Sequence, residues 1–419
     1  MRSVGESARV PLPAAFVNLN GRGYIPSRHM QIHHLVTDTP TLAALCERWA
    51  RTPFIAFDTE FMRENTFWPE LCLVQVASAE EAAAIDPLAP GLDLQPLLDL
   101  LVDNEDVLKV VHAGGQDLEI VYNLTGKTPH PMFDTQVAAM ALGLGEQAGY
   151  SSLVQSMLGI AIDKGARFTD WARRPLDKRQ LDYAVSDVTH LATLFPRMVE
   201  RLKKTGRGQW LDDEMERLTD PANYAQPPED AWRRVKASGR NPDMLGRLRA
   251  LAAWREREAQ AKNLPRGRIV KDETLADIAA HPPRTQDDLA RVRGLSPTWK
   301  TNDIGARLMG ALEAAVPFTP DELPDREGRG RGPGKDGQLI ADLLRLLLKI
   351  RSRDADVAPR LLARAEELDS LAGGQRDGLS MLQGWRFEAF GRDALELVEG
   401  RLAFAVKGGK LQLTRTEAA

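Results

Sequence analysis

The chain has only two cysteines, Cys46 and Cys72, among its 419 residues. Two cysteines form neither a disulfide framework nor a four-cysteine zinc site, and Cys72 lies in the apolar run LCLVQVA, which indicates a small core residue. The sequence also has no run of about 18 apolar residues, so we expect no membrane-spanning helix. These absences favour a protein of the reducing cytoplasm that works away from the membrane.

Residues 1–29 have weak patterning and are rich in proline and glycine. They have no compact apolar core of the kind that a secretion signal contains. We expect a disordered extension here or an over-extended start, with Met30 as an alternative start of translation; a targeting segment is the other alternative.

Charge is divided unevenly along the chain, although the net charge is only −4. Residues 30–205 hold 15 Lys and Arg against 24 Asp and Glu, a balance of −9, whereas residues 225–316 hold 17 against 12, a balance of +5. The first segment therefore repels a polyanion and the second attracts one.

Strand and helix patterns alternate in the acidic segment, which we assign to one domain over residues 30–206. This alternation predicts an α/β domain with a central sheet. Near its end, Asp177 and Gln180 resemble a capping box, and Pro196 is expected to kink the following helix or to end its first half. The expected strands include 54–61, 71–78, 82–88 and 108–115, and the expected helices include 41–50, 94–103, 116–124 and 134–143.

The rest of the chain shows helical patterns without a strand signal. We expect a hinge at 207–224, an all-α module at 225–316, a linker rich in proline, glycine and charge at 317–337, and a further helical part at 338–419.

Acidic residues stand where acids are unexpected. Asp58 and Glu60 interrupt the apolar strand FIAFDTEF two positions apart, so their side chains share one face. Asp117 follows a strand and a Gly-Gly corner, and Asp187 lies on a helix four residues after Tyr183. Taken singly, each has an ordinary explanation, such as an exposed strand edge or a favourable helix dipole.

Taken together, the four carboxylates suggest a metal site. Oxygen donors suit Mg²⁺ or Mn²⁺, and two such ions form a clamp for in-line displacement at a phosphodiester. Because a tyrosine hydroxyl ordinarily has a pKa of about 10, Tyr183 is suited to orienting the attacking water rather than to acting as a base.

The motifs DTE at 58–60, HAGGQD ending at Asp117 and YAVSD from Tyr183 to Asp187 resemble the three motifs of the DEDD exonucleases, in the tyrosine branch of that superfamily. Together with FDTQVAA, TDWARRPL and LDYAVSDV, they resemble bacterial ribonuclease D over roughly residues 35–205. Further along, LAAWREREAQAKNLPRGRIVKDETLADIAAHPP resembles an HRDC domain, and residues 338–419 occupy the place of a second, diverged HRDC domain in that family.

This resemblance implies a ribonuclease H-like exonuclease fold followed by all-α HRDC modules. It also implies removal of single nucleotides from RNA 3′ ends, release of nucleoside 5′-monophosphates and trimming of tRNA precursors. Carried over to this sequence, Asp58, Glu60, Asp117 and Asp187 hold two divalent metal ions, and Tyr183 orients the water.

Substrate contacts are expected more widely. Phe61 is a candidate for contact with the terminal base or for the core, and Gln75 and His112 for the cleft or for buried hydrogen bonds. In the basic module the favoured phosphate contacts are Lys262, Arg266, Arg268 and Lys271, each of which is also explained by an ordinary solvated face.

Two other functions remain open from the sequence. An exodeoxyribonuclease of the same superfamily has the same motifs, although the HRDC layout without helicase motifs favours RNA. A nucleic-acid-binding scaffold that has lost catalysis would be expected to have broken ligand positions, and none of the five is broken here.

Overall fold

A computed structural model describes residues 30–163, 165–236, 241–323 and 335–415. The expected extension at 1–29 and most of the expected linker therefore lie outside the described residues. The chain divides into two compact units. Unit 1 comprises the residues up to Glu60 together with Cys72–Pro221 and Arg329–Ala419, and unit 2 comprises Phe61–Leu71 and Ala222–Gly328.

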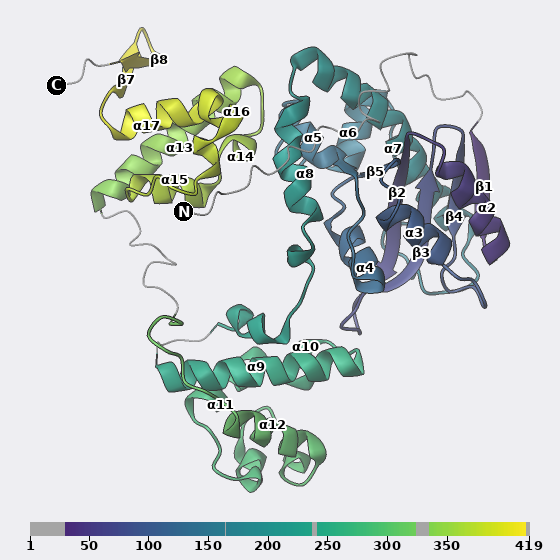
Figure 1. Ribbon diagram of the computed structural model, residues 1–419, viewed down its shortest axis with the longest axis vertical. Helices are drawn as coiled ribbons and strands as arrows, with labels where there is room; N and C mark the ends of the chain where they lie inside the picture. The colour runs from purple at the N-terminus through teal and green to yellow at the C-terminus, as the bar shows by residue number, and fades with distance from the viewer. Residues whose placement is uncertain (1–29, 164, 237–240, 324–334, 416–419) are drawn as a thin grey trace, which may run out of the picture. The chain divides into compact units, whose positions relative to one another are not determined.

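Unit 1 is built on a six-stranded mixed sheet with the strand order β1-β4-β3-β2-β5-β6 (Figure 1). Strands β2, β5 and β6 run parallel, β1 is parallel to β4, and β3 and β4 are antiparallel. This sheet confirms the predicted α/β domain. The strands are β1 (Gln31–Val36), β2 (Phe54–Met62), β3 (Glu70–Ala77), β4 (Glu81–Ile85), β5 (Leu108–Val111) and β6 (Met132–Asp134).

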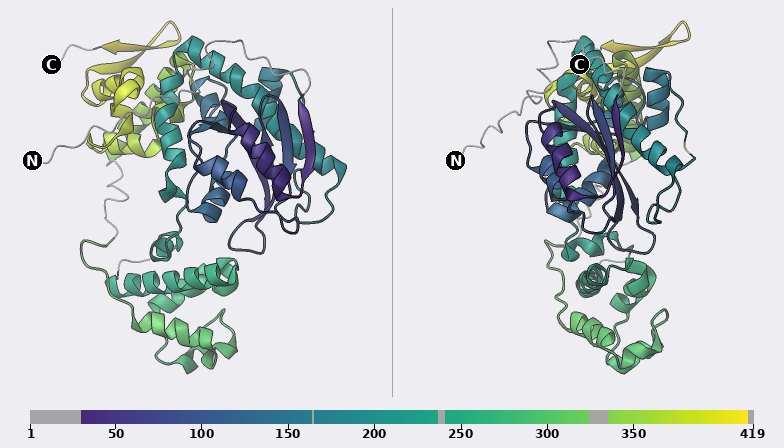
Figure 2. Two further views of the ribbon diagram at one scale, coloured as in Figure 1. Left: turned by 45° about the vertical axis from the view of Figure 1, so that its right-hand side comes forward. Right: turned by 90° about the vertical axis from the view of Figure 1, so that its right-hand side faces the viewer.

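Helices cover both faces of this sheet, as the right-hand view of Figure 2 shows. Helix α7 packs against β1, β4 and β5 and also contacts α5 and α6, whereas α2 packs with α3. The sheet is therefore buried on both sides, which explains the continuous apolar runs of its central strands. The helices are α2 (Thr39–Trp49), α3 (Gln95–Val102), α4 (Gly115–Thr125), α5 (Thr135–Ala141), α6 (Tyr150–Leu158) and α7 (Lys178–Thr205).

A tight corner joins β5 to α4, as the Gly-Gly pair predicts. Ala113 has a φ of 55°, and a Cβ atom added at Gly114 would lie 2.6 Å from Cγ2 of Val111. The backbone N–H groups of Ala113 and Gly114 each donate to the Asp134 carboxylate at 3.0 Å. The same carboxylate caps α5 by accepting from the Gln136 N–H at 2.7 Å. The corner sets the direction of α4 and so the place of Asp117 in its first turn.

Helix α7 begins at the predicted capping box. The Gln180 N–H donates to Asp177 Oδ1 at 2.8 Å, and the Asp177 N–H donates to Gln180 Oε1 at 3.0 Å. The alternative in which the helix ends near Pro196 is wrong, because α7 continues unbroken to Thr205. Buried apolar side chains precede and follow the proline, so packing offsets the one backbone hydrogen bond that proline removes.

In unit 2, every regular element among the described residues of 222–323 is helical. The helices α9 (Pro242–Lys262), α10 (Arg266–Ile269), α11 (Asp272–Ala280) and α12 (Asp303–Glu313) surround one apolar core, together with the short 3₁₀ turns η3 (Pro228–Arg234), η4 (Gln286–Arg291) and η5 (Pro297–Lys300). The loop at 61–71 belongs to this unit. Phe67 is buried in the core, and Asn263 accepts the backbone N–H groups of Phe67 and Trp68 at 3.1 and 3.0 Å.

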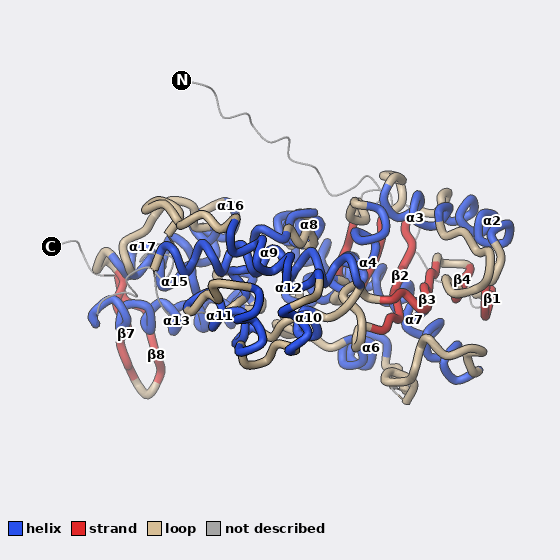
Figure 3. The backbone as a smooth tube through the Cα atoms, turned by 90° about the horizontal axis from the view of Figure 1, so that it is seen from below, coloured by secondary structure: helices blue, strands red, loops and turns tan. Residues whose placement is uncertain are grey.

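Residues 335–415 form a third helical group, which belongs to unit 1. It contains α13 (Lys335–Ala355), α14 (Pro359–Leu362), α15 (Ala365–Ala372), η6 (Ser380–Leu382), α16 (Gly384–Arg386), the π turn η7 (Phe387–Gly391) and α17 (Arg392–Val398). It ends in an antiparallel hairpin of β7 (Leu402–Lys407) and β8 (Lys410–Arg415), drawn in red at the lower left of Figure 3. The purely helical prediction for 338–419 is therefore wrong in its last part.

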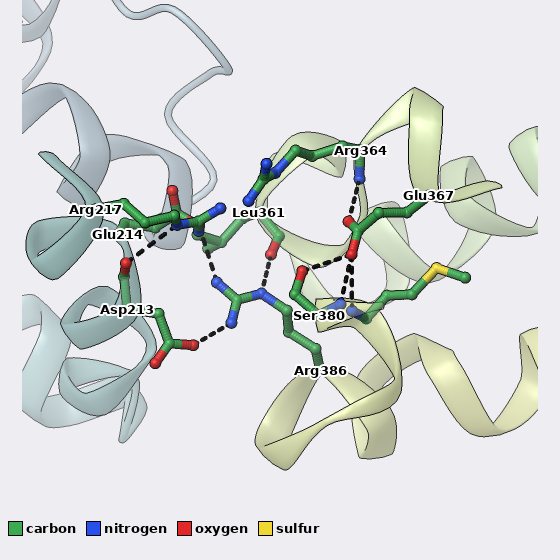
Figure 4. A network of polar contacts seen from close by, with 9 residues as sticks. Asp213, Glu214, Arg217, Leu361, Arg364, Glu367, Ser380 and Arg386 are labelled. Atoms are coloured by element: carbon green, nitrogen blue, oxygen red, sulfur yellow. Dashed lines mark hydrogen bonds and ion pairs between the residues drawn. The ribbon is translucent and has the colours of Figure 1, made fainter. Parts of the chain in front are cut away.

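The segment expected as a hinge contains η1 (Gly208–Leu211) and helix α8 (Asp212–Thr219), which contact the third helical group. Figure 4 shows Arg386 donating to the carboxylates of Asp213 and Glu214 and, at 3.0 Å, to the carbonyl oxygen of Leu361. Beside this network, the rings of Trp210 and Trp385 stack with centroids 4.1 Å apart. No helix in the described part of the chain is long and apolar enough to cross a bilayer.

Candidate active site

Strand β2 presents two carboxylates on one face. Phe57 and Thr59 are buried, whereas Asp58 and Glu60 alternate with them and are half-buried. Asp187 approaches the same place from α7, so that one oxygen from each of Asp58, Glu60 and Asp187 lies within 4.8 Å of the others. The side-chain period of a strand thus places two acids together, and the fold brings the third.

Asp117 is not one of the three carboxylates whose oxygens lie within 4.8 Å of one another, but it is connected to strand β2 through Thr59. It is buried in the first turn of α4, and the Thr59 hydroxyl donates a hydrogen bond to its carboxylate. Its charge and that of Asp58 repel each other. The two acids are therefore close enough to interact electrostatically.

Burial and mutual repulsion raise the pKa values of the cluster. Burial is the larger cause in each case, and it raises the pKa of Asp58 and of Asp187 to about 7 and that of Glu60 to about 9. Asp187 adds to the rise at Asp58, and Asp58 adds to the rise at Glu60. The pKa of Asp117 is also raised well above its usual value, mainly by burial. Carboxylates in such surroundings fit a hard divalent cation, which would offset their repulsion and favour their charged forms.

Two tyrosines hold Asp187. The Tyr183 side chain is hydrogen-bonded to the Asp187 carboxylate, and burial followed by the charge of Asp187 raises the pKa of its phenol. Tyr183 therefore stays protonated and can donate. The Tyr150 hydroxyl donates to the backbone carbonyl of Asp187, and burial also raises the pKa of this phenol. Sequence reasoning missed Tyr150 because it lies far from the motifs along the chain.

A cation that sequence reasoning also missed acts on the cluster. The charge of Arg167 opposes the rise in pKa at both Glu60 and Asp187. Arg167 lies in the turn before α7, close in sequence to Trp171, whose buried ring is 6.2 Å from that of Tyr183. The site therefore includes one positive side chain at its edge.

The other residues that the sequence singles out lie in varied surroundings. Gln75 is fully buried, and its amide atoms have no hydrogen-bond partner among the described residues. His112 is half-buried, with Nδ1 3.0 Å from Thr135 Oγ1 and its ring centroid 5.2 Å from that of Tyr150, and burial lowers its pKa. Phe61 is half-buried where unit 2 begins.

The four basic residues of unit 2 fall into two pairs. Lys262 bonds to Glu258 at 2.9 Å, and Arg266 bonds to the fully buried Glu256 at 2.6 Å. The remaining pair is exposed and makes no ion pair with the described residues; it consists of Arg268 and Lys271. Only the second pair therefore has its charge free for another partner.

Comparison with known families and proteins agrees with this geometry. A 3′–5′ exonuclease family matches residues 33–203, and the HRDC domain family matches residues 244–312. The chain is 70 % identical to Ribonuclease D of Sphingobium indicum and 62 % identical to that of Zymomonas mobilis, each over 93 % of this chain and 100 % of the relative.

Among solved structures, the chain is similar to Escherichia coli RNase D, described as an exoribonuclease involved in structured RNA processing. The TM-score is 0.74 at 29 % sequence identity, and the match covers 88 % of this chain and 99 % of that one. The likeness thus extends over nearly the whole of the relative.

Proposed function

The chain belongs to the ribonuclease D family and is a 3′–5′ exoribonuclease, and from that premise we propose that its acidic cluster binds two divalent cations, Mg²⁺ or Mn²⁺. The observation that carries the proposal is the convergence of oxygens from Asp58, Glu60 and Asp187 within 4.8 Å. Carboxylates this close, one buried and two half-buried, repel one another unless a cation or a proton intervenes. Asp117, which is bonded to Thr59, completes the proposed ligand set.

Bound divalent cations would supply an activated water at the scissile phosphodiester and stabilise the leaving oxygen. We assign to Tyr183 the positioning of that water, because its protonated hydroxyl donates to Asp187 and keeps its oxygen lone pairs available as acceptors. Tyr150 supports the same turn of α7 by bonding to the backbone of Asp187.

The proposed substrates are RNA 3′ ends, tRNA precursors in particular, and the proposed products are nucleoside 5′-monophosphates. Support comes from the family and from the Escherichia coli relative, which is described as acting in structured RNA processing. A precursor tRNA with a 3′ trailer tests this proposal. We expect the trailer to shorten stepwise and to leave the folded body; a trailer that survives while unstructured RNA is degraded would contradict the tRNA assignment.

In the HRDC domain we propose that Arg268 and Lys271 bind the phosphate backbone of RNA, because neither makes an ion pair with a described residue. Lys262 and Arg266 are weaker candidates, because Glu258 and Glu256 already hold them. Removing one side chain that binds a phosphate of single-stranded RNA should lower the salt dependence of the dissociation constant by about 0.7 in a double-logarithmic plot.

The direct test of catalysis uses a 5′-labelled RNA with an unpaired 3′ tail, with Mg²⁺ or with EDTA. We expect a ladder that shortens one nucleotide at a time from the 3′ end with Mg²⁺ and is absent with EDTA. Asp58→Ala should abolish it, whereas Asp99→Ala, a change outside the cluster, should not. Digestion by Asp58→Ala at the parent rate would refute the metal assignment.

The DNA alternative is tested by matched RNA and DNA strands of the same sequence. We expect faster digestion of RNA, and equal or faster digestion of DNA would favour an exodeoxyribonuclease. The non-catalytic scaffold predicts an intact strand in every lane together with retained binding.

We also propose the domain division 30–206, 225–316 and 338–419, in which the last part is a diverged second HRDC domain. Limited proteolysis should then cut first within 317–337.

A cytoplasmic location is proposed because Cys46 and Cys72 are both free and buried. Cell fractionation tests this location, and recovery from an oxidising compartment would contradict it.

A further inference from the structure

An exposed arginine and an exposed phenylalanine stand next to each other beside the acidic cluster. Phe168 is 90 % exposed, an unusual position for a large apolar side chain. The Arg167 guanidinium carbon lies 5.2 Å from the centroid of the Phe168 ring. Arg167 is exposed too, and it makes no ion pair with a described residue. The pair therefore exposes an aromatic ring and a positive charge to solvent, and the charge is not engaged in an ion pair with a described residue.

The turn that carries this pair is bonded to the start of helix α7. Ala166 is buried, and its carbonyl oxygen accepts from the Thr169 hydroxyl at 2.8 Å. The Gln180 amide, in the capping box of α7, donates to that hydroxyl oxygen at 3.1 Å. Trp171 is buried next to the ring of Tyr183. The turn is thus attached to the helix that presents Tyr183 and Asp187.

The charge of Arg167 also reaches the acidic cluster. Arg167 is near enough to Glu60 and Asp187 for its charge to act on both carboxyl groups. A guanidinium placed at the rim of an acidic pocket is suited to a phosphate that would otherwise be repelled. An aromatic ring beside it suits a base, since every base has a face that stacks.

We propose that Arg167 and Phe168 are substrate-contact residues for the single-stranded RNA end: Phe168 stacks on a base of the 3′-terminal dinucleotide, and Arg167 binds a phosphate next to it. This inference rests on the proposed function of the same site. It adds a means of holding the RNA end without sequence preference, because stacking and phosphate contacts are available to any nucleotide.

Binding without turnover tests the stacking. A short RNA with 2-aminopurine at either of its last two positions is titrated with protein in Ca²⁺, and its fluorescence is followed. We expect quenching with the parent protein, loss of quenching and roughly tenfold weaker binding with Phe168→Ala, and retention of both with Phe168→Trp. Leu124→Ala, an exposed apolar change on α4, is the matched control and should behave as the parent.

The arginine is tested by the salt dependence of the same binding. In a plot of the logarithm of the binding constant against the logarithm of salt concentration, Arg167→Ala should make the slope smaller by about 0.7. Arg167→Lys should keep the parent's slope, because lysine retains the charge. Arg173→Ala, at an exposed arginine of the same segment, should leave the slope unchanged. A merely structural role for Arg167 would weaken binding without moving the slope.

The result that overturns the inference is a Phe168→Ala protein that quenches and binds as the parent does, or an Arg167→Ala protein with the parent's slope. Failure of the proposed function is a separate outcome, since it shows as intact RNA with parent protein and Mg²⁺. The binding measurements decide the inference in either case, because they require no cleavage.

Discussion

Replacing Asp187 with asparagine should make the metal-free protein more stable, although it removes a residue of the active site. In the folded protein the carboxyl group of Asp187 is buried and close to Asp58 and Glu60. Without a cation, its charged form is disfavoured, and its pKa is raised from 3.8 to about 7. Asparagine keeps the shape and a hydrogen-bonding oxygen for Tyr183 but removes the charge.

The size and the pH window of this gain follow from the same shift. The folded state keeps the Asp187 proton to higher pH than the unfolded state does. The destabilisation that the Asp187 carboxylate causes is therefore absent below pH 4, grows between pH 4 and 7 and is complete above pH 7. Three pKa units correspond to about 4 kcal/mol at ~1.4 kcal/mol per unit. We expect about 2 kcal/mol, because a buried amide also loses contact with water.

Thermal unfolding in EDTA measures the gain. A gain of about 2 kcal/mol predicts a Tm for unit 1 that is roughly 4–8 °C higher for Asp187→Asn at pH 8, with little difference at pH 4. Saturating Mg²⁺ should reverse the order, since the parent gains a bound cation and the variant does not. Asp182→Asn, which changes an exposed acid paired with Lys178 on the same helix, should shift Tm little in either buffer.

A metal-free Asp187→Asn protein that is less stable than the parent at pH 8 would refute the electrostatic argument. So would a parent protein whose Tm does not respond to Mg²⁺.

Three further predictions concern residues outside the acidic cluster. Asn263→Ala should lower the free energy of unfolding of unit 2 by about 2–3 kcal/mol, because two backbone N–H groups lose their acceptor and because alanine is strained at the Asn263 φ of 48°. Asn263→Gly should cost less, since glycine tolerates that φ, and equal losses for the two variants in chemical denaturation would contradict this. Lys109 is buried, and burial is the main reason that its pKa is lowered to about 7. Its unfavourable contribution to the free energy of folding is therefore complete below pH 7 and is relieved as pH rises towards 10.5. Lys109→Met should flatten the dependence of stability on pH between these values, and an unchanged slope of stability against pH would contradict the assignment. Arg386→Met should lower the free energy of unfolding by about 2–3 kcal/mol and expose the third helical group to protease. Arg392→Met, which breaks an exposed ion pair, should lower it by under ~1 kcal/mol. Equal protease sensitivity of the two variants would refute the role given to the Arg386 network.

The sequence predicts much of the fold and of the site because several signals are local. Alternation along a strand is enough to place Asp58 and Glu60 on one face, and the Asp177 and Gln180 pair marks the start of α7. The Gly-Gly pair predicts the corner that leads into α4, although β5 ends at Val111, before the glycines. Each of these signals lies within a few residues, where backbone geometry decides the outcome.

Contacts between distant segments are not predictable in this way. Tyr150 and Arg167 reach the cluster from a separate helix and a turn, and no spacing in the sequence marks them. The β7–β8 hairpin is a different case. The sequence contains a local hairpin signal, alternating apolar residues followed by Gly408 and Gly409, which both have positive φ in the structure. Helical patterns precede this short signal and favour a helical prediction for the whole segment.

The most direct test of the central claim is the number and place of bound metal ions. Crystals soaked with Mn²⁺ and a nucleoside 5′-monophosphate would be measured for anomalous scattering. We predict two peaks about 4 Å apart within reach of the carboxylates of Asp58, Glu60, Asp117 and Asp187. A single peak would contradict the two-ion proposal, and no peak among these side chains would contradict the assignment of the cluster as a metal site.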